Sequence, residues 1–145
     1  FGPRQSPEGV YAAVIPKFID SLMKGKSPKI YGDGEQTRDF TYVKNVVEAN
    51  LLALFEENEM AFGQCFNVAC GDTISINQLF NDIKSAYQEV IGREVSVIPK
   101  HQEARSGDVR DSLADLSKIK DILGYNPQIS YLEGISETVQ WHLSR

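Results

Sequence analysis

The sequence predicts a mixed α/β lobe with about five helices and a few short strands. Capping residues and apolar side chains at helical spacing define the helices, and short apolar runs beside turn residues define the strands. At 145 residues the chain has the size of one domain, so we expect residues 1–145 to form a single lobe. Because the strands are few and short, we expect the lobe to pack against a larger sheet.

Each helix is predicted from one apolar face and from its end signals. The first has Pro16 in its first turn, carries the apolar residues Ile15, Phe18, Ile19 and Leu22, and ends at Gly25. The second carries Val47, Leu51, Leu54 and Phe55.

The third predicted helix begins at the Ser75–Gln78 capping box and ends at Gly92, and its buried face is expected to be Leu79, Phe80, Ile83, Tyr87 and Val90. The fourth carries Leu116, Ile119, Ile122 and Leu123 and ends at Gly124. The last begins at the Ser130–Glu133 capping box and is expected to bury Leu132, Ile135 and Val139.

The strand candidates are short and lie between the helices. They are Lys29–Tyr31, Asp39–Tyr42, Cys65–Ala69 and Val95–Pro99. A tight turn at Gly32-Asp33-Gly34 follows the first of them, because glycine tolerates the positive φ that such turns require.

The composition excludes several classes of function. A net charge of −5 argues against non-specific nucleic-acid binding, and no apolar run is long enough to span a membrane. Two cysteines are too few for a disulfide scaffold, and His101 and His142 have no companion residues at metal-ligand spacing. We therefore expect a cytoplasmic protein with no metal site and no membrane or nucleic-acid partner.

Two arginine-containing loops carry the chemistry that the chain offers. Arg38 lies in the run GDGEQTRDFTYV, and Arg105 precedes Ser106-Gly107-Asp108 in the run EARSGDVRDS. Arginine grips phosphate oxygens through its planar fork, and a carboxylate such as that of Asp108 is an acceptor for ribose hydroxyls. The two loops together predict a site for a nucleoside diphosphate.

Simpler roles remain open for both loops. Instead of binding a ligand, Arg38 would form an ion pair with Asp33, Glu35 or Asp39. The loop around Arg105 would instead be a solvated polar loop in which Arg110 and Asp111 pair with the other charged residues. Lys17 stands near the start of a predicted helix, where a cation opposes the helix dipole, and this conflict hints at a ligand contact. The side chain of Ser112 has no base beside it that would make it a nucleophile.

Five runs of the sequence, taken together, resemble one family. These are VIPKF at residues 14–18, IYGDGEQTRDFTYV at 30–43, FNVA at 66–69, RSGDVRDS at 105–112 and LGYNP at 123–127. They are similar to the carboxyl-terminal, substrate-binding half of extended short-chain dehydrogenase/reductases that act on nucleoside-diphosphate sugars. The nearest group is the bacterial UDP-N-acetylglucosamine 4-epimerases.

The resemblance implies a role for each matching position. Arg38 and Arg105 would contact the diphosphate, and Asp108 would hold the ribose. Ser112 would leave room for an N-acetyl group, since a bulky residue there would exclude it. The strip along the uracil and the nearby phosphate would consist of Ala13, Val14 and Lys17, with Lys29 and Tyr31 beside the base, while Phe1, Gly2 and Pro3 would pass the nicotinamide.

The resemblance also implies what the chain lacks. The family's Gly-rich dinucleotide loop, its catalytic Ser/Thr and its Tyr-x-x-x-Lys pair belong to an amino-terminal Rossmann part and do not occur in these residues. In an intact enzyme, a homodimer active in polysaccharide biosynthesis, NAD would oxidise the sugar at C4 and return hydride to the other face. The fragment alone would be inactive. Alternatives are a UDP-glucuronate decarboxylase, a nucleotide-sugar dehydratase, and a non-catalytic interaction domain.

Overall fold

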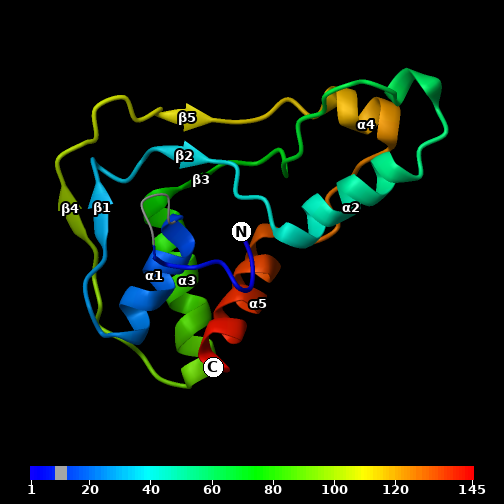
Figure 1. The fold of residues 1–145 in the computed structure, drawn as a ribbon. Helices are drawn as coiled ribbons and strands as arrows, with labels where there is room; N and C mark the ends of the chain where they lie inside the picture. The colour runs from blue at the N-terminus through cyan, green and yellow to red at the C-terminus, as the bar shows by residue number, and fades with distance from the viewer. Residues whose placement is uncertain (9–12) are drawn as a thin grey trace.

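The computed structural model describes residues 1–8 and 13–145, in which five α-helices alternate with very short strands (Figure 1). The predicted mixed α/β class is confirmed. In chain order the elements are α1 (Val14–Met23), β1 (Lys29–Tyr31), β2 (Thr37–Arg38), α2 (Val43–Leu54), the 3-10 turn η1 (Glu59–Ala61), β3 (Ile74–Ser75), α3 (Ile76–Ile91), β4 (Lys100–Gln102), β5 (Asp111–Ser112), α4 (Ser117–Leu123) and α5 (Tyr131–Leu143).

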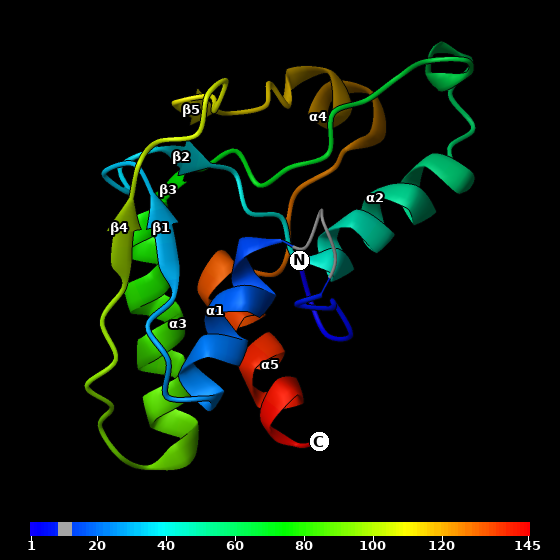
Figure 2. The same ribbon diagram turned by 60° about the vertical axis from the view of Figure 1, so that its left-hand side comes forward.

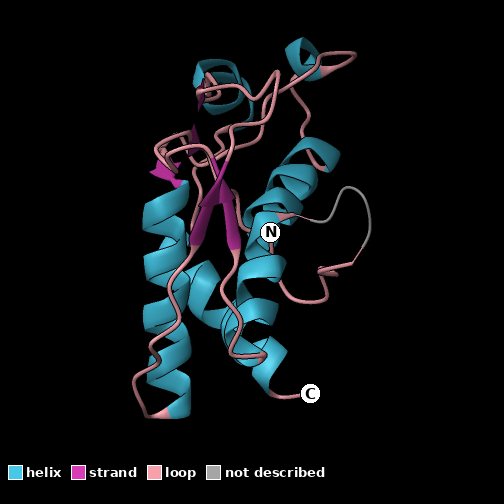
Figure 3. Ribbon diagram, turned by 90° about the vertical axis from the view of Figure 1, so that its left-hand side faces the viewer, coloured by secondary structure: helices cyan, strands magenta, loops and turns pink. Residues whose placement is uncertain are grey.

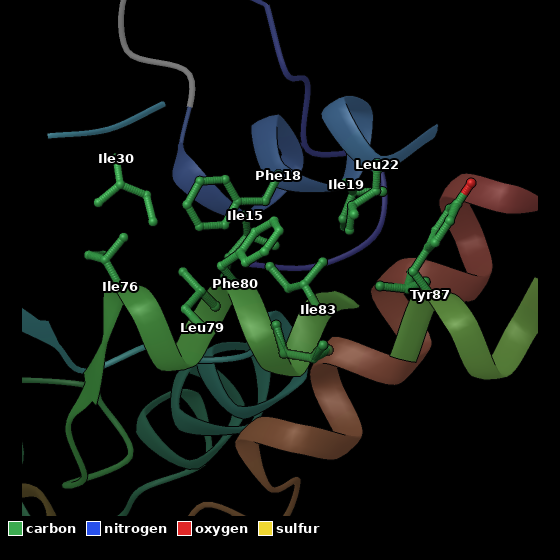
Figure 4. Close-up of a cluster of buried hydrophobic side chains, with 12 residues drawn as sticks. Ile15, Phe18, Ile19, Leu22, Ile30, Ile76, Leu79, Phe80, Ile83 and Tyr87 are labelled. Carbon is green, nitrogen blue, oxygen red and sulfur yellow. The ribbon is translucent and has the colours of Figure 1, made fainter. Parts of the chain in front are cut away.

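The main core lies where α3 packs against both α1 and α5 (Figure 4). Phe18 of α1 meets Phe80 of α3 edge-on, with ring centroids 5.5 Å apart. From the other side α5 contributes Ile135 and Val139, and β1 contributes Ile30. Each fully buried side chain of this kind stabilises the fold by about 1.5–3 kcal/mol. This cluster therefore fixes the positions of the three helices and of β1.

The predicted ends of α3 and the predicted start of α5 are confirmed by their caps. The Ser75 hydroxyl accepts a hydrogen bond from the Gln78 backbone N–H at 3.2 Å, and Ser130 does the same for Glu133 at 3.2 Å. The Gln78 side chain turns to Asp82 instead of back to the cap, so that capping box is only half formed. Gly92 ends α3 with a φ of 67°, a conformation that favours glycine.

The strands form two small sheets, drawn in magenta in Figure 3. In one, β1 pairs in parallel with β4, so that Ile30 lies opposite His101. In the other, β2 lies between β3, to which it is antiparallel, and β5, to which it is parallel. Arg38 is consequently the register partner of Ser112. The two sheets bring residues 29–38 beside residues 100–112.

A second cluster of buried side chains lies on the flank formed by α2 and α4 (Figure 2). It gathers Ala49 of α2, Ile119 of α4 and Tyr125, whose hydroxyl donates to the Ala69 carbonyl at 3.0 Å. Asn45 is fully buried beside this cluster. Its amide donates to the carbonyl of Ile129 and accepts from the backbone N–H groups of residues 128 and 129, which ties α2 to the start of α5.

The prediction of strand Lys29–Tyr31 is confirmed, and the other three strand predictions are wrong. The segment 39–42 runs from β2 into α2, with the Asp39 carboxylate accepting the N–H groups of Cys70 and Gly71. In the segment 95–99, side chains of α3 bond to the backbone in place of a neighbouring strand. The segment 65–69 is extended but has no strand beside it among the described residues.

Two predictions of buried helix faces are wrong in part, those for α3 and α5, and the apolar face that the sequence predicts for α2 is not covered by the described residues. The apolar face of α2 points outward, and its buried residues are Asn45 and Ala49. Val90 is exposed at the end of α3, and Leu132 is 60% exposed because α5 turns Ile135, Thr138 and Val139 toward the core instead. Hydrophobic spacing identifies which residues share a face, and tertiary packing decides whether that face is covered. No helix of the described residues is long and apolar enough to cross a membrane.

We expect the substitution Gly134→Ala to destabilise the fold. A Cβ at this position would lie 2.7 Å from Cγ of Tyr42, a side chain that is fully buried and whose hydroxyl donates to Glu137. Overpacking costs about 1–3 kcal/mol, which outweighs the gain of up to about 1 kcal/mol from replacing a helical glycine. Urea unfolding of the two proteins measures the difference.

The matched control is Gln140→Ala, which changes an exposed residue of the same helix. We expect it to change the free energy of unfolding by no more than about 0.5 kcal/mol. A Gly134→Ala protein as stable as the unchanged chain would contradict the close packing of α5 on Tyr42.

Candidate functional site

A cavity of about 470 Å³ opens beside α1, β1 and the loop before β5. This volume is in the range of small-molecule sites, about 300–1,000 Å³. Its wall combines apolar and charged side chains, a composition that suits a ligand with both a flat ring and charged groups. The residues around it are Pro7, Val14, Lys17, Phe18, Asp20, Ser21, Ser27, Pro28, Lys29, Ile30, Tyr31, Gln36, Ile76, Arg105 and Asp108. Six residues that the sequence analysis assigns to the site line this one cavity: Val14, Lys17, Lys29, Tyr31, Arg105 and Asp108.

The alternation of β1 explains how one short strand serves both the core and the cavity. Ile30 is buried in the main core, while Lys29 is exposed and Tyr31 is half-buried. Successive side chains of a strand point to opposite faces, so Lys29 and Tyr31 share the face away from the core. The exposed side chain of Lys17 approaches the same cavity from the first turns of α1.

Arg105 lies flat against Tyr31 at the edge of the cavity. Its guanidinium carbon is 3.8 Å from the centroid of the Tyr31 ring. The hydrogen bond and the positive charge of Arg105 lower the pKa of the Tyr31 phenol. Stacking of this kind orients the guanidinium and leaves the edge of its plane able to bind an anion.

Arg38 holds the other end of the same loop. Its guanidinium forms an ion pair with Asp108 at 2.5 Å and also donates to the Thr37 carbonyl at 2.7 Å. The three ion-pair partners that the sequence offered for Arg38 are therefore not used. Asp33 pairs with Arg110 instead, at 2.7 Å, and this pairing lowers the pKa of the Asp33 carboxyl.

A tight turn connects the residues that face the cavity. The Asp108 backbone N–H donates to the Arg105 carbonyl at 3.2 Å, and Gly107 in between has a φ of 80°, which is costly for other residues. The turn places Arg105 and Asp108 on the cavity wall, and Arg38 reaches that wall through its bond to Asp108. The guanidinium of Arg105 lies over Tyr31, and that of Arg38 lies against Asp108.

The remaining predicted residues lie outside the cavity lining. Ala13 is the half-buried residue before α1, and Ser112 is exposed on β5 beside Arg38. Phe1 is half-buried and packs on Tyr42, with ring centroids 5.4 Å apart, on the side of α2 and α5. Pro3 is half-buried in a turn that it forms with Arg4.

The sequence reasoning missed Gln36, which also lines the cavity. Its side-chain amide donates to the Tyr31 carbonyl at 2.8 Å, and its Oε1 is buried without a hydrogen-bond partner in the described part of the chain. Gln36 stands two residues before Arg38, and residues at this spacing share one face of an extended segment. That spacing was the signal in the sequence.

Comparison with known proteins supplies the context for this geometry. The sequence profile of the family described as GDP-mannose 4,6 dehydratase matches residues 1–138. The chain belongs to this family, within the extended short-chain dehydrogenase/reductases. A putative UDP-glucose 4-epimerase of Methanocaldococcus jannaschii is 41% identical over 97% of this chain and 42% of its own length. A UDP-N-acetyl-α-D-glucosaminuronate decarboxylase of Bacillus cytotoxicus is 33% identical over 97% of this chain and 43% of its own length.

Solved structures of the family have the same fold. A UDP-N-acetylglucosamine 4-epimerase from Methanobrevibacter ruminantium, in complex with UDP-N-acetylmuramic acid, superposes with a TM-score of 0.86 at 41% identity, covering 99% of this chain and 43% of that one. A UDP-glucuronic acid 4-epimerase from Bacillus cereus, in complex with UDP-glucuronic acid and NAD, gives 0.82 at 26% identity, covering 99% and 42%. The chain thus spans less than half the length of these family members and matches their carboxyl-terminal part.

We expect the substitution Arg105→Ala to raise the pKa of the Tyr31 phenol, because the hydrogen bond and the charge that lower it would be lost. Carbon-13 NMR of ring-labelled tyrosine, with Tyr31→Phe to assign the signal, follows this phenol through a pH titration. Arg110→Ala is the control, since that guanidinium pairs with Asp33. An unchanged Tyr31 pKa in the Arg105→Ala protein would contradict the stacked geometry.

Proposed function

We propose that this chain is the substrate-binding part of a UDP-sugar 4-epimerase that interconverts UDP-N-acetylglucosamine and UDP-N-acetylgalactosamine through a 4-keto intermediate. The observation that carries the proposal is the cavity, whose wall combines Tyr31, two lysines and Arg105 with the ion pair of Arg38 and Asp108. Similarity to an epimerase named for UDP-N-acetylglucosamine supports the choice of sugar.

The cations around the cavity suit a diphosphate. Lys17, Lys29 and Arg105 line it together with Asp20 and Asp108, so the wall has one more cation than anions in a chain whose net charge is −5. A diphosphate between Arg105 and Arg38 would replace the Asp108 carboxylate as the partner of Arg38, since phosphate oxygens accept from a guanidinium equally well. The freed carboxylate would then accept the two hydroxyls of the ribose.

The base would lie on the apolar part of the wall. Val14 and the Tyr31 ring offer flat or apolar contacts there, and we assign Ala13 and Lys29 to its border. Gln36 has a buried carbonyl oxygen without a partner among the described residues, next to the Tyr31 backbone that its amide fixes. We add Gln36 to the residues that position Tyr31 beside the base.

Ser112 would face the sugar. The β2–β5 pairing places it directly beside Arg38, so a ligand phosphate held by that arginine brings the attached sugar close to a small, exposed hydroxyl. A serine leaves volume for an N-acetyl group, whereas an aromatic residue would fill it.

The described residues do not fit NAD as a site of their own. The sequence has no Gly-rich turn between strand and helix for a pyrophosphate, and the ring of Phe1 is packed against Tyr42 and Tyr131. We therefore place the NAD site and the proton-transferring side chains in the rest of a chain of the relatives' length. Phe1 and Pro3 would at most border that site, and this chain would bind and orient the nucleotide.

A decarboxylase or a dehydratase is the second candidate, and the relative from Bacillus cytotoxicus favours the former. Both reactions would use the same nucleotide grip and differ at the sugar. A chain that binds no nucleotide would instead be a non-catalytic interaction domain.

We expect UDP to bind and the substitution Arg105→Ala to weaken it about ten- to a hundredfold, the worth of a charged hydrogen bond of roughly 1.5–3 kcal/mol. Isothermal titration calorimetry with UDP measures both constants. Arg93→Ala is the matched control, because Arg93 is an exposed arginine just after α3 and does not line the cavity. Equal affinities for all three proteins would remove Arg105 from the site.

The reaction itself is tested on the product of the complete gene, incubated with NAD and either UDP-N-acetylglucosamine or UDP-glucuronate. We expect the galacto isomer of the first substrate. A pentose product from the second would identify a decarboxylase, and a 4-keto-6-deoxy product would identify a dehydratase.

In the same assay, Ser112→Tyr should lower kcat/KM for UDP-N-acetylglucosamine much more than for UDP-glucose, because the ring would occupy the N-acetyl space. Ser96→Tyr, at an exposed position before β4, should change neither value. An equal loss for the two sugars would argue against Ser112 as the residue that admits the N-acetyl group.

A further inference from the structure

Segment 103–113 carries three of the residues that we assign to the site, yet it buries none of its own side chains. All of its residues are exposed, and even Val109 and Leu113 are 59% and 61% exposed. Burial of apolar side chains is what usually fixes a segment on a protein, at roughly 25 cal/mol for each Å² removed from water. Polar and stacking contacts therefore hold this segment in place.

The first of these contacts attach the segment to residues 31–38, which run beside it (Figure 1). Arg105 stacks on Tyr31, and Asp108 pairs with Arg38. A bound diphosphate would engage both arginines and would take Arg38 from its carboxylate partner. These two contacts are therefore the ones that change when the site is filled.

The contacts farther along the segment involve no group that the ligand would take. Arg110 pairs with Asp33, but both side chains are largely exposed, and an ion pair at such a position contributes little. The backbone N–H of Thr37 donates to the Arg110 carbonyl at 2.8 Å. The Thr37 hydroxyl donates to the Asp111 carboxylate, also at 2.8 Å. Thr37 thus holds β5 through both its backbone and its side chain.

Strand β5 is short enough to depend on this side-chain bond. The β2–β5 ladder consists of two register pairs, Thr37 with Asp111 and Arg38 with Ser112. Aspartate is among the residues depleted from strands, and Asp111 forms no ion pair with the described residues. The Thr37 hydroxyl gives its carboxylate a partner. The next pair of the ladder then lies at the ordinary strand spacing of about 4.8 Å, which sets how far Ser112 is from the backbone of Arg38.

We propose that Thr37 and Asp111 are positioning residues that set the sugar selectivity of the site. The inference rests on the proposed function, because it takes Arg38 as a phosphate ligand and Ser112 as the residue beside the N-acetyl group. Without the side-chain bond the two-residue ladder would fray, and Ser112 would no longer lie at a fixed distance from the phosphate. UDP-N-acetylglucosamine would then lose the contact of its N-acetyl group with β5, whereas UDP-glucose has no such group.

Competition against labelled UDP for the complete gene product tests the proposal, since it measures the affinity for each sugar nucleotide without requiring turnover. Thr37→Val keeps the shape of the side chain and removes the hydroxyl. We expect it to lower the affinity for UDP-N-acetylglucosamine relative to UDP-glucose by about two- to tenfold, the range of one hydrogen bond. Thr37→Ser keeps the hydroxyl and should retain the original ratio. An unchanged ratio in the Thr37→Val protein, or an equal loss for both sugars, would overturn the proposal.

Asp111 supplies the second half of the test. Asp111→Ala should change the ratio as Thr37→Val does, and the double variant should change it no further, because both substitutions remove the same bond. Additive changes would overturn the pairing. The matched control is Thr73→Val, which alters a threonine outside the cavity and outside the β2–β5 ladder and should leave the ratio as it is.

The same titrations separate this proposal from the proposed function. Failure of UDP itself to bind the unchanged protein would remove the nucleotide site, and the positioning role with it. Normal UDP binding together with an unaltered sugar ratio in the Thr37→Val protein would overturn the positioning role alone.

Discussion

The packing of α3 against both α1 and α5 is the interaction on which the rest of this structure depends. It buries Phe18 against Phe80 on one side and brings in Ile135 and Val139 on the other. Ile30 joins the same core and fixes β1, and β1 in turn holds β4 by parallel pairing. The cavity is the space between these fixed parts and the loop that leaves β4. The candidate site thus rests on an apolar core, three residues of which, Phe18, Ile30 and Ile76, also line the cavity.

The candidate site is held by charges that the protein balances internally. Arg38 is satisfied by Asp108, and Arg105 by stacking on Tyr31. Both contacts lie at the surface of the cavity. A diphosphate there would replace Asp108 as the partner of Arg38 with little loss of hydration of the guanidinium, because the ion pair is partly exposed. The free arrangement therefore keeps the arginines oriented without burying an unpaired charge, and an anion of higher charge density would displace Asp108.

The apolar side chains and backbone groups around α3 have packing and hydrogen-bond partners, whereas several of those around α2 have none among the described residues. Around α3 the apolar residues meet each other, and the backbone groups at the helix ends have caps. Around α2 the apolar face of the helix is uncovered, and the extended segment 65–69 has no strand beside it within the described residues. The contrast agrees with a chain that spans less than half the length of its relatives.

Local chemistry in the sequence determined the helices, their caps and the loops that carry Arg38, Arg105 and Asp108, because capping, helical spacing and turn glycines act over a few residues. Only the tertiary structure decided which apolar faces are buried, as Leu51 and Leu132 illustrate, and which extended segments become strands, as 65–69 illustrates. Strand pairing and burial require a partner distant in the sequence. For the same reason the pairing of Arg38 with Asp108 emerged from the fold alone.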